Sequence, residues 1–261
     1  MNLQDKKEEA SSPITDNTGI PPKTIICDDF EAMSQYCADL ICEAVKKKPD
    51  LLLCLAAGNT AIRTYQILKE RSDCGQTDFS RAEFVELDEW LDLDDESENC
   101  TSFMFKNFYG PLHIEDSKIH LFDIHAKDME KECKRIDRLI FERNGIDFML
   151  LGLGMNGHLA LNEPGSSFDS YAKVVTLDTV TQTVGQKYFS KPVRLSRGVT
   201  LGIRHILDAN QVVLQAGGKS KAEIVKKICQ TKPTPLLPAT VMQLVNNGVV
   251  VLDRDAASEI L

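Results

Sequence analysis

Apolar residues fall into two kinds of segment that alternate along the chain. Short apolar-rich runs are typical of strands buried within a sheet. Longer stretches with apolar residues three or four positions apart are typical of amphipathic helices. The predicted strands lie at residues 51–57, 83–87, 118–122, 146–154, 211–218 and 249–253, and the predicted helices at 30–47, 60–72, 101–109, 127–143 and 219–229.

This alternation predicts an α/β fold. Strands that alternate with helices of about 10–15 residues form a mostly parallel, Rossmann-like sheet with helices on both faces. The chain shows no internal repeat and no low-complexity linker, so we expect a single domain over residues 22–261. Residues 1–21 are polar and aperiodic, and we predict a disordered N-terminal tail without chemistry.

Composition removes several classes of function. The 261-residue chain has a formal net charge of −9, which argues against nucleic-acid binding because phosphate backbones require a basic surface. It has no apolar stretch of about 18 residues, so we expect no membrane segment. Its eight cysteines lack metal-ligand spacing and are predicted to be reduced thiols of a cytoplasmic protein, with no metal bound.

Four polar segments follow predicted strands: AAGNT (56–60), ELDEW (86–90), GLGMNGH (152–158) and AGGKSK (216–221). Ligands of parallel α/β sheets bind at the carboxyl ends of the strands. The four segments should therefore lie along one edge of the sheet and share one site.

Two of these segments can bind an anion. Gly58, Asn59 and Thr60 precede a helix, whose first turn offers free N–H groups and a positive dipole end. The alternative is an ordinary glycine turn with Thr60 as N-cap. At the other segment, Lys219 or Lys221 could supply a positive charge, or could simply be solvated at the start of a helix.

The loop at QKYFSK adds two further candidate cations. Lys187 and Lys191 could bring positive charge to an anion from outside the strand ends, although surface lysines are common. The loop AAGNT fits neither GxGxxG nor a Walker loop, so a nucleotide is not indicated there.

Acid–base chemistry is indicated at ELDEW. Asp88 lies between Glu86 and Glu89 and close to the only tryptophan, Trp90. A carboxylate in a partly apolar pocket has a raised pKa and exchanges protons near neutrality. The alternative is a solvated acidic loop, which suits residues 92–98 better than the end of the strand.

A histidine lies shortly after the predicted strand at residues 146–154. His158 lies next to Gly157, with Asn156 two residues before it and Glu163 five residues after it. A turn would bring both polar side chains to the imidazole and fix its tautomer. A lone histidine is often structural, but a histidine on a glycine loop at a strand end favours proton transfer to a ligand.

The chain resembles the glucosamine-6-phosphate deaminase/6-phosphogluconolactonase family from about residue 24 to the C-terminus. The pattern GxxxNGHxxxNEP is the most specific part of the likeness. LDEW followed by DL is most similar to the galactosamine-6-phosphate isomerase branch. The segments that carry the resemblance are CLAAGNTAIRTY, FVELDEWLDL, LLGLGMNGHLALNEPGSS, RGVTLGIRHILDA and AGGKSKA.

The resemblance implies a cofactor-free isomerisation that converts a 2-amino-2-deoxyhexose 6-phosphate into a ketohexose 6-phosphate and releases ammonia. By this resemblance Asp88 is the base at carbons 2 and 1, and His158 opens the pyranose ring. Glu163 and Asn156 orient the imidazole. The implied phosphate ligands are Gly58, Asn59, Thr60, Lys221 and Lys187. The only partner implied is the small phosphorylated substrate, and a homo-oligomer stays open.

The sequence departs from the family in two phosphate-binding segments. The usual loop, TGGTP or TGATP, is Ala57-Gly58-Asn59-Thr60-Ala61 here, and Lys187 stands where an arginine precedes two aromatics. Only Lys173 and Val175 match the two basic residues that bind an allosteric activator in some members. Glucosamine 6-phosphate, 6-phosphogluconolactone and a sugar-phosphate sensor without turnover stay open as alternatives to a galactosamine-6-phosphate isomerase/deaminase.

Overall fold

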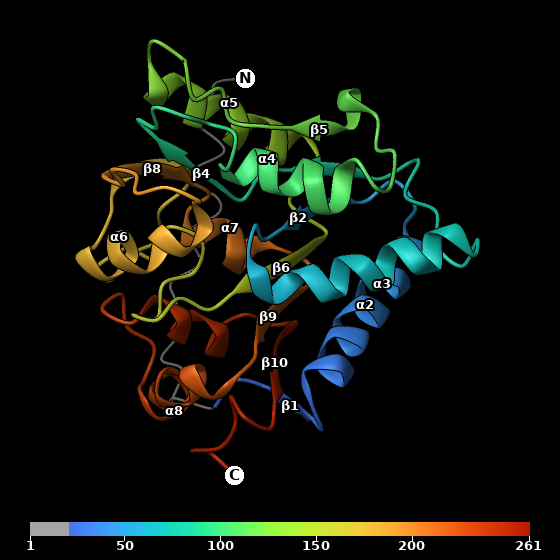
Figure 1. The fold of residues 1–261 in the computed structure, drawn as a ribbon, viewed down its shortest axis with the longest axis vertical. Coiled ribbons are helices and arrows are strands. Elements are labelled where there is room, and N and C mark those ends of the chain that lie inside the picture. The colour runs from blue at the N-terminus through green and yellow to red at the C-terminus, as the bar shows by residue number, and fades with distance from the viewer. Residues whose placement is uncertain (1–20) are drawn as a thin grey trace.

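The computed structural model describes residues 21–261, and the predicted tail falls outside the described residues except for Pro21. Seven strands form a central sheet in the order β1-β10-β9-β6-β2-β3-β5, and every neighbouring pair is parallel. Figure 1 shows this sheet running through the middle of the molecule. The strands are β1 (Thr24–Cys27), β2 (Leu52–Leu55), β3 (Glu83–Val85), β5 (Ile119–His120), β6 (Phe148–Gly152), β9 (Val212–Ala216) and β10 (Gly248–Asp253).

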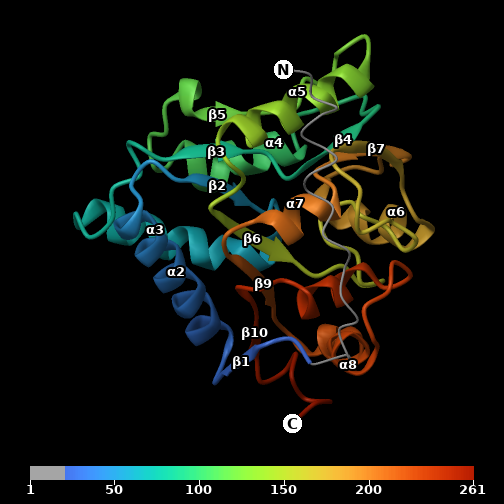
Figure 2. The ribbon, with the colours of Figure 1, turned by 180° about the vertical axis from the view of Figure 1, so that it is seen from behind.

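Helices cover both faces of this sheet, as the apolar runs predict. One face packs against α2 (Phe30–Lys47), α3 (Ile62–Asp73), α4 (Cys100–Met104) and the π-helical turn η2 (Phe105–Tyr109). The other packs against α5 (Met129–Glu142), α7 (Ile203–Asp208), α8 (Ala222–Gln230) and the 3-10 helix η6 (Pro238–Gln243). Figure 2 shows the second face from behind. Because both faces are covered, β2 is buried along its whole length.

Local sequence signals explain where several helices begin. Asp29 accepts a hydrogen bond from the N–H of Ala32 and caps α2, which has the bounds that the spacing predicts. Asp128 caps α5 in the same way through the N–H of Lys131. A side-chain oxygen at the cap satisfies one of the N–H groups that the first helical turn leaves free.

A second, three-stranded antiparallel sheet in the order β4-β8-β7 was not predicted from the pattern of apolar residues. Its strands are β4 (Asp88–Leu91), β8 (Arg197–Thr200) and β7 (Lys173–Thr176). It lies beside the parallel sheet together with α6 (Thr179–Gly185) (Figure 1). Asp88 pairs with Thr200 and is therefore the first residue of a strand, not the last residue of the preceding one.

Three other observations complete the fold. The pattern assigns no element to residues 24–27, which form the edge strand β1 and pair with β10. Among residues 21–261, no helix is both long enough and apolar enough to cross a membrane. All eight cysteines are free thiols.

Candidate active site

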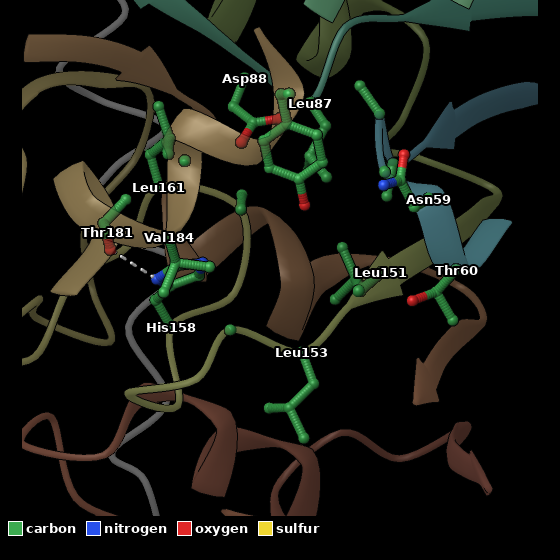
Figure 3. A pocket seen from close by; sticks show the side chains of 18 of the residues that line it. Asn59, Thr60, Leu87, Asp88, Leu151, Leu153, His158, Leu161, Thr181 and Val184 are labelled. Atoms are coloured by element: carbon green, nitrogen blue, oxygen red, sulfur yellow. Dashed lines mark hydrogen bonds between the residues drawn. The ribbon is translucent and has the colours of Figure 1, made fainter. Parts of the chain in front are cut away.

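The carboxyl ends of β2, β6 and β9 open into one pocket, as predicted for a parallel sheet. Its walls and open mouth enclose about 1020 Å³ of empty space. Concave pockets with a few convergent polar groups are typical of small-molecule sites. Figure 3 shows Asp88 and His158 on one side of the cavity and Asn59 and Thr60 across from them.

All four strand-end segments contribute to this pocket. Seven of the nine residues predicted for the site line it, and they come from five separate parts of the chain. Asn156 and Glu163 do not line it but lie behind the histidine. The lining residues are Gly58, Asn59, Thr60, Asp88, His158, Lys187 and Lys221.

The loop after β2 forms one wall of the pocket. The 3-10 helix η1 (Asn59–Ala61) continues directly into α3, and no side chain caps either start. Thr60 is therefore not an N-cap, which removes the alternative of an ordinary capped turn. The uncapped start leaves N–H groups and the positive end of the helix dipole facing the pocket. The loop is anchored by the buried Gln215, whose amide donates to the carbonyl of Thr60 over 3.4 Å.

Lys221 provides the buried positive charge of the pocket. It follows β9 on the 3-10 helix η5 (Lys219–Lys221), and its ammonium donates to the carbonyl of Leu153. Burial, together with the nearby charge of Lys187, lowers the pKa of Lys221 to about 8. Lys219 is exposed and does not line the pocket, so the structure separates the two candidate lysines of this segment.

Lys187 reaches the same pocket from the 3-10 helix η4 (Gln186–Tyr188). Its Nζ lies 5.0 Å from the centre of the Tyr188 ring, within the range of a cation–π contact. Lys187 itself is exposed, so its charge is more strongly screened by solvent than that of Lys221.

Asp88 enters the pocket from the start of β4 and keeps part of its side chain exposed. Burial, and then the negative charge of Glu89, raise the pKa of Asp88 to about 7. A carboxyl group with this pKa both accepts and returns a proton near neutral pH.

The two flanking glutamates have structural contacts instead. Glu86 accepts hydrogen bonds from the Thr101 hydroxyl (2.7 Å) and the N–H of Phe122 (2.8 Å). Glu89 accepts from three backbone N–H groups, including those of Cys100 and Thr101 at the start of α4. Neither glutamate lines the pocket. Glu89 follows Asp88 on β4, and its charge contributes to the raised pKa of Asp88.

His158 is held by a set of polar contacts on the side of the ring away from the cavity. Its Nδ1 lies 3.1 Å from the hydroxyl of Thr181 and 3.5 Å from Oε2 of Glu163. Asn156 donates to the same carboxylate over 2.9 Å and accepts from the backbone N–H of His158. The predicted orienting partners are thus brought together with the ring.

Gly154 supports the flat side of this imidazole. A Cβ added there would lie 2.3 Å from Cδ2 and 2.4 Å from Nε2 of His158, so only glycine leaves room for the ring. Gly154, in the GLGMNGH segment, therefore leaves the space that the imidazole of His158 occupies.

Two pocket residues were missed by the sequence reasoning. Thr181 lies on α6, and Tyr188 on η4 places its hydroxyl about 4.0 Å from the position of a Cβ on Gly58. Both lie in residues 170–198, where no strand-end motif pointed to them. The only available signal was the likeness of the KYF segment to a phosphate-binding segment of the family.

Among the described residues, no group of three or more histidine, cysteine, aspartate or glutamate side chains is arranged to hold a metal ion. The polar side chains of the pocket include a carboxyl group, an imidazole and two amines. Fold and pocket together are typical of an α/β protein that binds a small ligand at the carboxyl ends of its strands.

Comparison with known proteins gives the family. The family model described as glucosamine-6-phosphate isomerases/6-phosphogluconolactonase matches residues 29–251. A glucosamine-6-phosphate deaminase from Thermoanaerobacter sp. (strain X514) is 35% identical over 238 residues, which cover 90% of this chain and 94% of the relative. A glucosamine-6-phosphate deaminase from Bacillus pumilus (strain SAFR-032) is 36% identical, and the match covers 88% of this chain and 97% of the relative. The chain therefore belongs to the glucosamine-6-phosphate isomerase/6-phosphogluconolactonase family, as its motifs indicate.

Solved structures agree with this assignment. A monomeric glucosamine-6-phosphate deaminase superposes with a TM-score of 0.87 at 34% identity, covering 91% of this chain and 99% of its own. A 6-phosphogluconolactonase from Trypanosoma cruzi superposes with a TM-score of 0.75 at 20% identity. This match covers 94% of the present chain and 98% of the lactonase chain. The second likeness shows the shared fold only.

Proposed function

We propose that this protein is an amino-sugar-phosphate isomerase/deaminase that turns a 2-amino-2-deoxyhexose 6-phosphate into a ketohexose 6-phosphate and ammonia. One observation carries the proposal: Asp88 and His158 face the same pocket whose opposite wall is an uncapped helix start, with Lys221 beside it. Two proton-transfer groups and one anion site are what such a substrate requires.

The anion site holds the substrate by its phosphate. The N–H groups at Gly58–Thr60 donate to the phosphate oxygens, and Lys221 and Lys187 supply positive charge. Contacts far from the reacting carbons fix the orientation of the sugar, so carbons 1 and 2 lie at the end of the pocket that holds Asp88 and His158.

His158 opens the ring in the proposed reaction. Its Nε2 takes the proton of the C1 hydroxyl and returns a proton to the ring oxygen, which leaves an open-chain aldehyde. Only then is the hydrogen on carbon 2 acidic enough for removal. Glu163 stabilises the imidazolium that exists between the two transfers.

Asp88 then moves one proton between two carbons. Its carboxylate removes the proton from carbon 2 and returns it to carbon 1, while a second proton passes from the amino group to the oxygen on carbon 1. Carbon 1 thereby becomes a CH2OH group and carbon 2 an imine. Water adds to that imine and ammonia leaves, which gives the ketohexose 6-phosphate. The pKa of about 7 suits a group that must both accept and donate.

The epimer at carbon 4 distinguishes two forms of this proposal. LDEW followed by DL supports galactosamine 6-phosphate, because this segment is most like the galactosamine branch. The names of the curated relatives support glucosamine 6-phosphate. We propose the galacto substrate first and the gluco substrate as the second candidate.

Ammonia release from purified protein tests the proposal. Galactosamine 6-phosphate, glucosamine 6-phosphate and a sugar phosphate without an amino group are compared at equal concentrations. The proposal requires ammonia from at least one amino sugar and none from the third compound. Binding without ammonia would instead support a sensor, and hydrolysis of 6-phosphogluconolactone alone would support a lactonase.

The pH dependence of kcat/KM is expected to be bell-shaped, with its optimum between about 7 and 8. Below the pKa of Asp88, about 7, the carboxyl is protonated and cannot act as base. Above the pKa of Lys221, about 8, the amine loses the charge that attracts phosphate. A pH–rate profile of the wild-type protein checks both limbs.

The variant Lys221→Met is the control for this profile. It should keep the acidic limb and flatten the alkaline one, apart from what the amine of the substrate contributes. An acidic limb centred near pH 4, where an ordinary aspartate titrates, would contradict the role of Asp88 as base.

A further inference from the structure

Thr181 is the polar residue of the pocket that no strand-end motif explains. It lies on α6, and its side chain is only 4% exposed although its helix is at the surface. Its hydroxyl lies 3.1 Å from Nδ1 of His158, the contact drawn as a dashed line in Figure 3. A buried hydroxyl must satisfy its hydrogen bonds inside the protein, so its proton has a definite place.

Glu163 lies on the same edge of the imidazole. Its Oε2 is 3.5 Å from Nδ1 and accepts from the amide of Asn156, while its Oε1 accepts from the backbone N–H of Asp178 over 3.2 Å. Burial raises the pKa of Glu163, but the hydrogen bonds and charge of His158, with hydrogen bonds from Thr181 and Asn156, outweigh it and bring the pKa below its ordinary value. Glu163 is therefore ionised and can only accept hydrogen bonds.

Two oxygens face Nδ1 of His158: the hydroxyl of Thr181 at 3.1 Å and Oε2 of Glu163 at 3.5 Å. The ionised carboxylate can only accept, so a proton on Nδ1 suits both oxygens, whereas a lone pair on Nδ1 would face the negative charge of Glu163. Nδ1 is consequently the protonated nitrogen of the neutral ring, and Nε2 keeps its lone pair.

We propose that Thr181 is a positioning residue that completes a relay in which the Nδ1–H of His158 is held between two acceptors, the hydroxyl oxygen of Thr181 and the carboxylate of Glu163. The relay fixes the neutral tautomer in which Nε2 faces the pocket as a proton acceptor. The inference rests on the proposed function, since an acceptor at Nε2 is what opening of the sugar ring needs.

The relay also ties α6 to the catalytic histidine. Asp178 caps α6 with its side chain while its backbone N–H holds Glu163, and Thr181 is one turn further along. Val180 and Val184 of the same helix line the pocket, and Lys187 follows it. A ligand that contacts this helix therefore contacts the element that orients the imidazole.

Three variants on α6 test the relay. Thr181→Val keeps the shape of the side chain and removes the hydroxyl, and we expect kcat to fall roughly tenfold with KM nearly unchanged, the loss of one orienting hydrogen bond. Thr181→Ser restores the hydroxyl and should restore kcat. Thr183→Val is the matched control, since that hydroxyl is exposed and donates only to the carbonyl of Thr179 in its own helix.

A spectroscopic readout is independent of turnover. Nitrogen-15 spectra of the imidazole side chains at mildly alkaline pH distinguish the two neutral tautomers, and comparison with His158→Gln identifies the signal of His158. Wild type and Thr183→Val should show the proton on Nδ1, whereas Thr181→Val should show a mixture.

The outcomes separate the relay from the reaction. If Thr181→Val keeps both the tautomer and kcat of wild type, or loses kcat without any change in tautomer, the relay is wrong. If the wild-type protein releases no ammonia from either amino sugar, the proposed function fails while the spectra still decide the relay.

Discussion

Replacement of Asp88 by asparagine is expected to abolish turnover while substrate affinity stays nearly unchanged. The amide has the size of the carboxyl group and can occupy the same position at the start of β4, but it cannot accept the proton from carbon 2. A general acid–base group accelerates a reaction about 10²–10⁴-fold, so kcat should fall by roughly a thousandfold or more. Single-turnover ammonia release measures kcat, and competition by a ketohexose 6-phosphate measures affinity.

Stability measurements show whether the loss is catalytic. Because folding raises the pKa of Asp88, its ionised form destabilises the folded protein at a pH above that raised value. The asparagine variant should therefore unfold at the same or a higher temperature than wild type at mildly alkaline pH. An inactive variant with a markedly lower unfolding temperature would assign Asp88 to structure.

Asp92→Asn is the matched control. Asp92 follows β4 on the same segment, but it is exposed, does not line the pocket, and pairs with Arg197 at 2.7 Å. Exposed ion pairs contribute little to stability, so this variant should keep wild-type turnover. Comparable ammonia release from Asp88→Asn and Asp92→Asn would remove Asp88 as the base.

Loss of the charge at Lys221 is expected to weaken phosphorylated ligands by about a hundredfold. Hydrogen bonds to charged groups contribute about 1.5–3 kcal/mol, and Lys221 is the partly buried cation of the pocket. Lys221→Met keeps the aliphatic stem, so the packing around η5 is preserved. KM for the amino-sugar phosphate should rise, and inorganic phosphate should lose its inhibition to the same extent.

The neighbouring lysine is the control for this variant. Lys219 carries the same charge two residues earlier but is exposed and outside the pocket, and Lys219→Met should leave KM unchanged. A dephosphorylated amino sugar should bind wild type and Lys221→Met equally weakly. Equal losses for phosphorylated and dephosphorylated sugars would assign Lys221 to the support of the Leu153 carbonyl instead.

The altered phosphate loop is compatible with an anion site in this geometry. Gly58 has extended backbone dihedrals, and a Cβ there would meet nothing closer than the Tyr188 hydroxyl at 4.0 Å. In the proposed site the phosphate contacts are made by backbone N–H groups at a helix start, and these are present whether residue 59 is small or an asparagine.

The pattern of apolar residues determined most of the parallel sheet and its helices. Six of the seven strands of the central sheet were predicted, because a strand buried on both faces requires an apolar run whatever its neighbours are. The four strand-end motifs were predicted to share one edge, since parallel strands point the same way, and they line one pocket. The Asn156–His158–Glu163 grouping was also predictable, because these residues are close together in the chain.

Only the tertiary structure decided where Asp88 and Thr181 stand. Asp88 belongs to a four-residue strand whose partner, Arg197–Thr200, is far away in sequence, and such a pairing leaves no local period. Thr181 contacts His158 only because that antiparallel sheet brings α6 back to the loop after β6. The sequence by itself determined which residues could carry protons and charge; the long-range packing decided which of them meet, because contacts between distant segments depend on the whole fold and not on neighbours in the chain.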